Sequence, residues 1–193
     1  MTEFDPAYAG TWVIDPAHSR FGFAVKHAMV SKVRGRFDDV SGALEVGEDG
    51  LPSARVSVTV PVASINTSHA ARDAHLRTND FFEAAKHPEI TFRSTQIDQV
   101  SDTAFLVIGD LTIKGTTRRL GIPLEHTGIG RDQLGYLRAG FEGTRRIDRR
   151  EFGLDFQVPL DAGGVLVSDR ITLEFELSLV HMEPGLPWPP PGI

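Results

Sequence analysis

The chain has 193 residues, a formal net charge of −6 at pH 7 and no cysteine. This length is typical of a single domain with its own hydrophobic core. The acidic balance argues against a nucleic-acid groove, because such a groove needs a stripe of Lys and Arg to neutralise phosphates. The lack of cysteine excludes disulfides, zinc–thiolate sites and cysteine nucleophiles.

The first residues, Met-Thr-Glu-Phe-Asp-Pro, have neither the basic region nor the apolar region of a secretion signal. No apolar run in the sequence approaches the roughly 18 residues that a membrane-spanning helix needs. We therefore expect a soluble, cytoplasmic protein.

Alternation of apolar and polar residues with a period of two predicts that most of the chain forms β-strands. The clear stripes are Phe21, Phe23, Val25 and His27; Val56, Val58, Val60 and Val62; Phe152, Leu154, Phe156, Val158 and Leu160; and Ile171, Leu173, Phe175, Leu177 and Leu179. Further strands are expected at 32–46, 89–97, 103–114, 118–126 and 135–144. Many strands with almost no helix predict an antiparallel sandwich or barrel.

Prolines and glycines mark the breaks between these strands. Pro61, Pro123 and Pro159 fall on polar faces, where each removes a backbone donor, so they indicate strand ends, bulges or edges. Gly-rich segments at 47–50, 128–130 and 163–164 predict loops.

A barrel of about eight strands either fills its interior with side chains or holds one small ligand. The inward stripes of this chain are long, and several inward candidates are small, namely Ala139, Gly143 and Ser94. These features favour an interior with room for a ligand.

Residues 66–88 are the one stretch that does not follow the strand pattern. A cap at Thr67 or Ser68 predicts a helix that runs to about Thr78. A second capping pattern, D-x-x-E within residues 80–88, predicts a short further turn. The sequence thus predicts a helical lid in a sheet protein, and scaffolds of this kind usually carry their specificity in such a piece.

The expected helix has two faces that could contact the barrel. One arc of about 100° contains His69, Arg72, Asp73 and Leu76. It includes the only large apolar residue of the helix, Leu76, which favours this face for the interior. The alternative packs the small face of Ala70, Ala71 and Ala74 and leaves the charged residues in solvent.

The histidines do not form a known metal-binding motif. His69 and His75 are six residues apart, on opposite sides of the expected helix, and no H-E-x-x-H pattern occurs. A zinc site would need His18 or His27 to be brought in by the fold. The chain also lacks a G-x-S-x-G nucleophile turn, a Gly-rich phosphate loop and a glycosidase-like carboxylate pair.

The strongest basic cluster consists of Arg145, Arg146, Arg149 and Arg150, and it is diluted by Asp148 and Glu151. Such a cluster can hold an anionic headgroup or can form a solvated turn. The sequence leaves both interpretations open.

Several segments, in order from about residue 10 to residue 180, resemble the YceI-like family of lipid-binding proteins. They are Asp15-Pro-Ala-His-Ser19 with Phe21, Phe23 and His27; Val33-Arg-Gly-Arg-Phe37 with Ser41-Gly42; Arg72-Asp-Ala-His-Leu-Arg77 with Asp80-Phe-Phe82 and Pro88-Glu-Ile-Thr-Phe92; Gly109-Asp-Leu-Thr-Ile-Lys-Gly-Thr-Thr-Arg118; and Ile147-Asp-Arg-Arg-Glu-Phe-Gly153. The chain departs from the usual pattern at Asn66, where Asp is usual, and at Asp148 and Glu151, where Asn and Asp are usual.

The resemblance implies an all-β fold, an extended lipocalin-like antiparallel β-barrel with one short helical lid inserted between strands. It implies non-enzymatic binding, storage or transport of a long apolar ligand, which would be a polyisoprenoid, an isoprenoid quinone or a related lipid. The alternative function is a histidine-dependent enzyme or a haem- or metal-binding barrel. We expect residues 1–10 to be a flexible N-terminus, residues 11–182 to form the barrel domain, and residues 183–193 to be a disordered Pro-rich tail.

The expected apolar wall of the ligand site consists of Phe21, Phe23, Val25, Phe92, Leu111, Ile113, Phe141, Phe156, Phe175 and Leu177. The expected polar end consists of Asn66, His69, Arg72, Asp73 and His27. The expected partners are a long-chain isoprenoid or another lipid and, transiently, a membrane, and a homodimer is left open. No cofactor, metal or nucleic acid is expected.

Overall fold

A computed structural model describes residues 8–28, 30–159, 166–185 and 187. The strands are β1 (Gly10–Ile14), β2 (Arg20–His27), β3 (Ser31–Phe37), β4 (Ser41–Gly47), β5 (Gly50–Pro61), β6 (Ile65–Asn66), β7 (Glu89–Gln99), β8 (Ala104–Ile113), β9 (Thr116–Arg131), β10 (Leu137–Asp148) and β11 (Val167–His181). The helical segments are α1 (Ala70–Leu76) and the 3-10 turns η2 (Val62–Ser64) and η3 (Arg149–Phe152). Residues 1–7 of the expected N-terminal tail, most of the expected Pro-rich tail and the expected loop at 163–164 lie outside the described residues.

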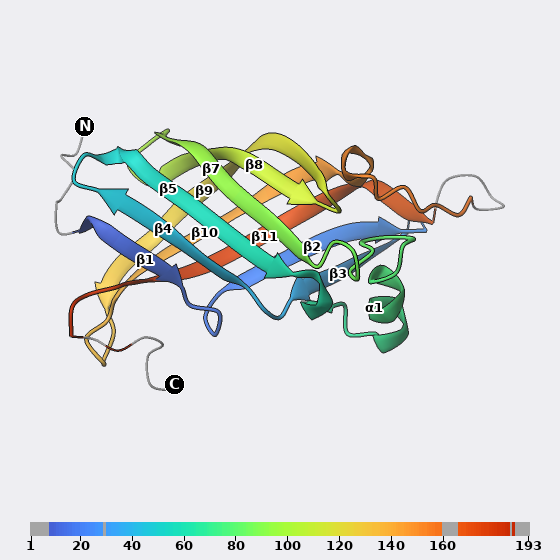
Figure 1. The fold of residues 1–193 in the computed structure, drawn as a ribbon, viewed down its shortest axis with the longest axis horizontal. Coiled ribbons are helices and arrows are strands. Elements are labelled where there is room, and N and C mark those ends of the chain that lie inside the picture. Colours follow the sequence, from blue (N-terminus) through green and yellow to red (C-terminus); the bar gives the residue numbers. More distant parts are fainter. Residues whose placement is uncertain (1–7, 29, 160–165, 186, 188–193) are drawn as a thin grey trace.

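Eight antiparallel strands close into a barrel in the order β1, β4, β5, β7, β8, β9, β10 and β11. Figure 1 shows β4, β5 and β7 crossing in front of β9, β10 and β11, with α1 at one end, which we call the lid end. Strands β2, β3 and β6 continue the sheet from β11. The all-β, lipocalin-like barrel with one short helix inserted between strands is confirmed.

Strand β11 closes the barrel. Along one edge it pairs with β10 from Arg170 to Val180, and along the other it pairs first with β2 and then with β1. The β1 pairing consists of Trp12 with His181, Val13 with Val180, and Ile14 with Leu179. One strand therefore pairs with two others that lie end to end along its edge. The strand predicted from the alternation over residues 171–179 is confirmed.

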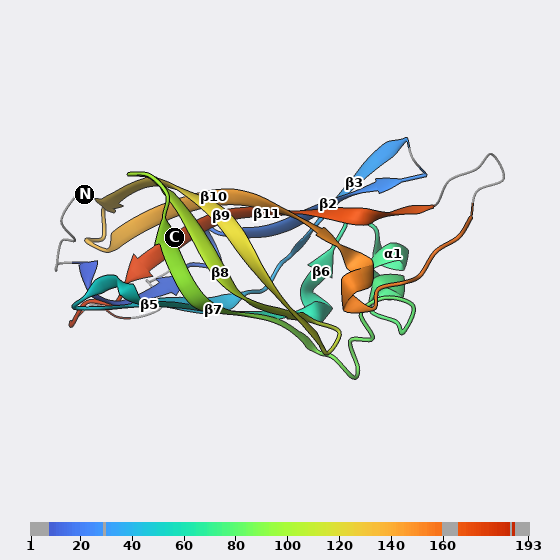
Figure 2. The ribbon, with the colours of Figure 1, turned by 90° about the horizontal axis from the view of Figure 1, so that it is seen from above.

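Strands β9 and β10 pair along only part of their lengths. The ladder runs from Leu137 with Arg131 to Glu142 with Glu125, and beyond it β9 pairs only with β8 and β10 only with β11. Figure 2 shows the two strands separating toward the lid end. The ladder stops near Pro123, whose carbonyl faces β10 at Gly143. In a β-strand, the N–H and C=O of one residue face the same neighbouring strand. At Pro123 the ring therefore stands where another residue would donate its N–H to β10.

The interior contains two buried apolar clusters. The cluster nearer the lid consists of Phe81, Phe92, Val107, Leu111, Ile113, Ile122, Phe152 and Leu154. The second consists of Trp12, Ile14, Phe21, Val40, Val60, Ala139 and Leu179. Val58, Ile90 and Phe175 pack against both clusters and so connect them.

One strand prediction is wrong. Residues 152–158 do not form the expected strand: they follow the η3 turn, Phe152 and Leu154 are buried, Val158 is exposed, and Leu160 lies outside the described residues. The alternation there reflects a turn that buries one side, because Arg149 holds it by donating to the carbonyls of Leu154 and Ser168. The range 32–46 contains two strands, β3 and β4, separated by a turn.

The expected lid helix is also shorter than predicted. Helix α1 has seven residues, and its N-cap is His69, whose Nδ1 accepts a hydrogen bond from the Arg72 N–H at 3.2 Å. Residues 77–87 form turns, in agreement with the short further turn that the D-x-x-E pattern predicts. No helix in the described part of the chain is long and apolar enough to cross a bilayer.

A charged network lies over the closing strand. Arg138 on β10 donates to Asp15 and to Asp132, each at 2.6 Å, and His18 Nδ1 lies 2.7 Å from Asp15. The Asp15 N–H donates to the Ser178 carbonyl of β11 at 2.9 Å. Burial alone would raise the pKa of Asp15, but the hydrogen bonds from Arg138 and His18 outweigh it and lower that pKa. The network therefore fastens the loop after β1 to β10 across β11.

We predict that Arg138→Met lowers the free energy of unfolding at pH 7 by about 3 to 5 kcal/mol, because it removes the cation that pairs with both the buried Asp15 and the partly buried Asp132. A lowered folded-state pKa means that charged Asp15 stabilises the fold above its unfolded pKa of about 3.9. This stabilisation is lost as the pH falls through the lower folded pKa. Urea unfolding should therefore show that the difference in free energy of unfolding between wild type and Arg138→Met becomes smaller as the pH falls through this range.

The control for this experiment is Arg131→Met, which removes an exposed arginine that pairs with Glu183. Its effect should be small because exposed ion pairs contribute little. A difference between wild type and Arg138→Met that is the same at pH 7 and pH 3 would contradict the role given to Asp15.

Candidate functional site

The inner faces of β2, β10 and β11 form one continuous apolar wall. Phe175 of β11 pairs with Phe21 of β2 on one side and with Gly143 of β10 on the other. The same alternation places further apolar residues on this face, namely Phe23, Val25, Phe141, Ile171, Leu173 and Leu177. The register of three strands therefore sets the composition of this wall.

Most side chains of this wall are only partly buried. Phe23, Val25, Phe141, Phe175 and Leu177 all keep some accessible surface although they face the inside of the barrel. Phe21 is an exception, at 9% exposure.

The opposite wall is closely packed, because Phe92, Leu111 and Ile113 are 5 to 6% exposed and belong to the cluster around Phe152. The accessible interior surface thus lies mainly along β2, β10 and β11. The expected wall residues divide between an accessible side and a packed side.

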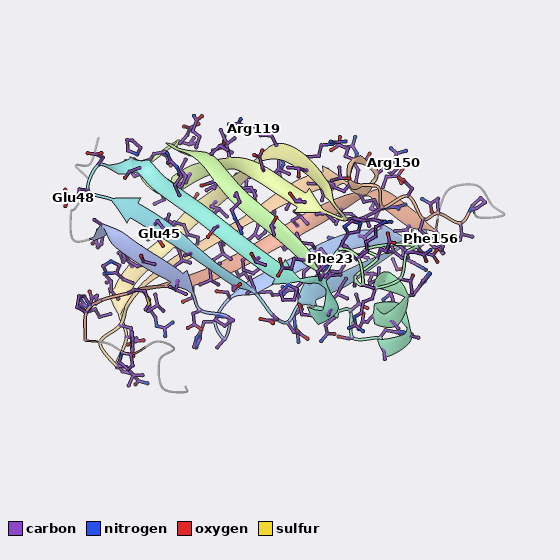
Figure 3. All side chains as sticks on the ribbon, in the orientation of Figure 1. Phe23, Glu45, Glu48, Arg119, Arg150 and Phe156 are labelled. Atoms are coloured by element: carbon purple, nitrogen blue, oxygen red, sulfur yellow. The ribbon has the colours of Figure 1, made fainter. Side chains whose placement is uncertain are left out.

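Aromatic side chains line both ends of the accessible wall. At the lid end, the ring of Phe156 lies 4.9 Å from that of Phe81 and 5.1 Å from that of His75. Figure 3 shows Phe23 and Phe156 in the half of the barrel nearer α1, with Glu45 and Glu48 in the other half. In that other half, His126 lies 5.2 Å from Phe141, centroid to centroid.

Several residues of the interior were missing from the sequence-based selection. They are Phe37, Phe82, Phe105, His126 and Leu173. Leu173 and His126 continue alternations that were visible in the sequence. Phe37 likewise follows Val33 and Gly35 in an alternation within the expected range 32–46. Phe82 carries no such signal, because its ring approaches that of Phe37, with 6.3 Å between the ring centroids, only after the lid segment has folded onto β3.

The small inward residues do not provide the room that the sequence suggested. Ala139 is 7% exposed and is packed within the second cluster. At Gly143, an added Cβ would clash with the Pro123 carbonyl, so glycine is required by the close approach of β9. Ser94 accepts a hydrogen bond from the Val56 N–H at 2.7 Å and completes the backbone pairing of β5.

The lid helix is fastened to the segment that precedes it. The buried carboxylate of Asp73 accepts hydrogen bonds from the backbone N–H and the hydroxyl of Thr67. Arg72 donates to the same residue, from Nε to the hydroxyl at 2.7 Å and from Nη2 to the carbonyl at 2.8 Å. Arg77 donates to the carbonyls of Ala63 and Ile65. These contacts fix α1 in its place at the barrel end.

The helix faces the barrel with the arc favoured by the sequence. Asp73 is buried, and Arg72 and Leu76 are partly buried, whereas the alanines of the alternative face are exposed. His69 differs from this pattern, since it is exposed at the N-cap.

The other expected polar residues lie apart from Arg72 and Asp73. Asn66 donates to Asp38 at 2.6 Å and accepts from the Ser68 N–H at 2.8 Å. His27 lies at the end of β2, opposite Ser31 and Val167. The fold thus brings Arg72 and Asp73 together at Thr67, whereas Asn66 is hydrogen-bonded to Asp38.

The histidines are dispersed, and the described residues contain no group of three or more His, Asp or Glu that could hold a metal ion. His18 pairs with Asp15, and His75 Nε2 lies 2.7 Å from Asp80. His181 is 9% exposed, with its Nε2 2.9 Å from the Ala9 carbonyl. Each of these three histidines has its own separate neighbour.

The basic cluster divides into different roles. Arg149 is 3% exposed, and burial lowers its pKa although Asp169 lies 3.2 Å away. Arg150 pairs with Asp148 at 3.0 Å and with Asp169 at 3.4 Å. These two arginines hold η3 and the start of β11, so they do not act as a free anion site.

An eight-stranded antiparallel barrel with one apolar inner wall and a short helix at one end defines a lipocalin-like barrel protein. The model of the YceI-like domain matches residues 12–179. The chain belongs to the YceI-like family, as the sequence motifs indicated.

Relatives of known sequence and structure agree with this assignment. A UPF0312 protein of Vibrio parahaemolyticus is 36% identical over 170 residues, which cover 87% of this chain and 88% of that protein. The crystal structure of the Campylobacter jejuni YCEI protein has a TM-score of 0.70 and 28% identity, covering 95% of this chain and 100% of that one. A polyisoprenoid binding domain from Saccharophagus degradans shares the fold, with a TM-score of 0.64 and 16% identity over 89% of this chain and 98% of that one.

We predict that Asp73→Ala lowers the free energy of unfolding of the ligand-free protein by about 1.5 to 3 kcal/mol, because Thr67 loses a charged acceptor. Chemical denaturation monitors this change. Lys86→Ala, which alters an exposed pair with Glu83 in the same segment, is the matched control and should have little effect. Unchanged stability of Asp73→Ala would show that the lid is held by other contacts.

Proposed function

We propose that this protein binds a long apolar ligand in the barrel interior and stores or carries it without changing it chemically. The ligand class is a polyisoprenoid, an isoprenoid quinone or a related lipid. The observation that carries the proposal is the row of large apolar side chains on β2, β10 and β11 that face inward and yet remain partly accessible. In a close-packed interior such side chains would be buried. The fold shared with a polyisoprenoid binding domain supports the same ligand class.

Burial of the lipid chain does not by itself determine which lipid binds. Each buried CH₂ contributes about 0.8 kcal/mol, so a few isoprene units already supply more transfer energy than a usual affinity requires. A lipid that leaves a membrane exchanges one apolar environment for another and gains little of this energy. Selectivity then depends on the length of the interior and on contacts with the headgroup.

The polar end of the site is proposed to lie at the lid end and to involve His27, Asn66, His69, Arg72 and Asp73. The hydrogen bonds of Arg72 and Asp73 to Thr67 give these two residues a second role in holding α1. His75 is a further candidate, because its ring lies edge-on to Phe81 and Phe156 at the end of the apolar wall.

The accessible wall can be blocked without disturbing the packed wall. We predict that Leu177→Trp abolishes binding of a long isoprenoid and lowers the free energy of unfolding by no more than about 1 to 3 kcal/mol, since the larger ring occupies accessible space. Glu176→Trp is the control, because Glu176 is the preceding residue of the same strand and is exposed. Binding is measured by quenching of tryptophan fluorescence with a polyene-labelled isoprenoid. Equal binding by both variants would place the ligand elsewhere.

The chemical inertness of the protein is a separate prediction. Organic extraction and native mass spectrometry of protein purified from its own host should identify a long apolar lipid. Incubation of that lipid with the protein should return it unchanged. Conversion that requires the protein and disappears in His75→Ala would refute the proposed carrier function and favour a histidine-dependent enzyme.

A further inference from the structure

The separation of β9 and β10 leaves a groove in the outer wall of the barrel. Its volume is about 390 Å³, within the range of roughly 300 to 1,000 Å³ that is usual for small-ligand sites. The groove is lined by Arg118, Arg119 and Leu120 of β9, Arg145, Arg146, Ile147 and Asp148 of β10, Glu151 of η3 and Arg170 of β11. We call it the seam groove.

The seam groove has an excess of positive charge. Five arginines and two carboxylates line it, which leaves a formal charge of +3. Asp148 is already engaged, because Arg150 donates to it from outside the groove at 3.0 Å. Among the described residues, none of the five groove arginines forms a salt bridge. Arg119 donates instead to the neutral hydroxyl of Thr95 at 2.7 Å.

Arg145 is the residue that most clearly lacks a partner. It lies on β10 opposite Leu173, on the inner face of the sheet, and reaches the groove where β9 has moved away. Its Nε is buried and has no hydrogen-bond acceptor in the described structure. The neighbouring Arg149 is also buried, but the fold supplies it with the carbonyls of Leu154 and Ser168 and with Asp169. A buried donor without an acceptor is costly, so an incoming anion would stabilise Arg145.

The floor of the groove strengthens this attraction. Leu120 and Ile147 line the groove and also pack against the cluster around Phe152. An anion above this apolar floor is partly shielded from water, and charge-assisted hydrogen bonds are stronger in such surroundings. Figure 3 shows Arg119 and Arg150 along the same edge of the barrel. Arg118, Arg146 and Arg170 of the lining are exposed, so the groove can be reached from solvent.

We propose that the seam groove binds a phosphate or diphosphate group. Guanidinium groups match phosphate oxygens with pairs of parallel hydrogen bonds, and several arginines in one groove suit a multivalent anion better than a single carboxylate. The phosphate is either free or part of a lipid headgroup. The site lies where β9 and β10 separate, and its lining contains none of the residues proposed for the apolar wall of the interior site.

The test is calorimetric titration of the full chain at low salt with inorganic phosphate, diphosphate, farnesyl diphosphate and farnesol. We expect saturable binding of diphosphate. Arg145→Met and Arg146→Met should each weaken it by about tenfold or more, the scale of one charged hydrogen bond. Arg34→Met, which removes an exposed arginine of β3 outside the groove, is the matched control and should change it by less than about twofold. If Arg145→Met does not fold, Arg146→Met and Arg170→Met, both at exposed positions of the groove, provide the same test.

The lipid arms identify the source of the phosphate. Tighter binding of farnesyl diphosphate than of diphosphate, weakened by the same substitutions, supports a lipid headgroup, whereas equal binding supports free phosphate. No saturable binding of diphosphate or farnesyl diphosphate by the folded wild type would overturn the proposal, as would an equal loss in Arg34→Met. Loss of binding to anionic vesicles in the groove variants, without any binding of diphosphate, would also overturn it and indicate a membrane contact. Binding of farnesol without binding of diphosphate rejects the seam groove as a phosphate site and leaves the interior function in place. Binding of diphosphate without binding of farnesol rejects only the interior function.

Discussion

The backbone hydrogen bonds that β11 makes along both edges are the constraint on which the barrel depends. Its pairing with β10 and β2 fixes the register that places Phe21, Phe175 and Gly143 on one inner face. Its short pairing with β1 closes the ring, and the contacts of Asp15 with Arg138 and Ser178 reinforce that closure from outside. The apolar wall and the closed fold therefore have the same origin.

The incomplete pairing of β9 with β10 explains why the two inner walls differ. Where the strands separate, η3 inserts Phe152, and the cluster around it packs β7, β8 and β9 from inside. On the wall formed by β2, β10 and β11, Leu173 and Phe175 pack against the same cluster and yet stay partly accessible. One break in a ladder thus produces a packed side, an accessible side and, on the outer surface, the seam groove.

The sequence predicts the elements better than their contacts. The alternation from residue 171 to 179 locates β11 because a strand with one face in solvent has this pattern. The same alternation from Phe152 onward is misleading, since a turn held by Arg149 can bury every second residue without a strand partner. The lid could be located as well, but the use of Asp73 could not, because its contact with Thr67 depends on how the segment before the helix folds back on it. Likewise, adjacent arginines acquire different roles only through tertiary contacts.

The order of the strands along the chain also bears on how the domain is made. The strand that closes the ring is the last strand of the domain to leave the ribosome, and it must pair with β1, the first. Neighbouring pairs such as β4 with β5 and β7 with β8 can form early, whereas contacts between distant parts of a chain form slowly. Until β11 arrives, β10 and β1 each present an unpaired edge, which is prone to association. The apolar interior therefore stays open to chaperones at least until the final strand has been translated.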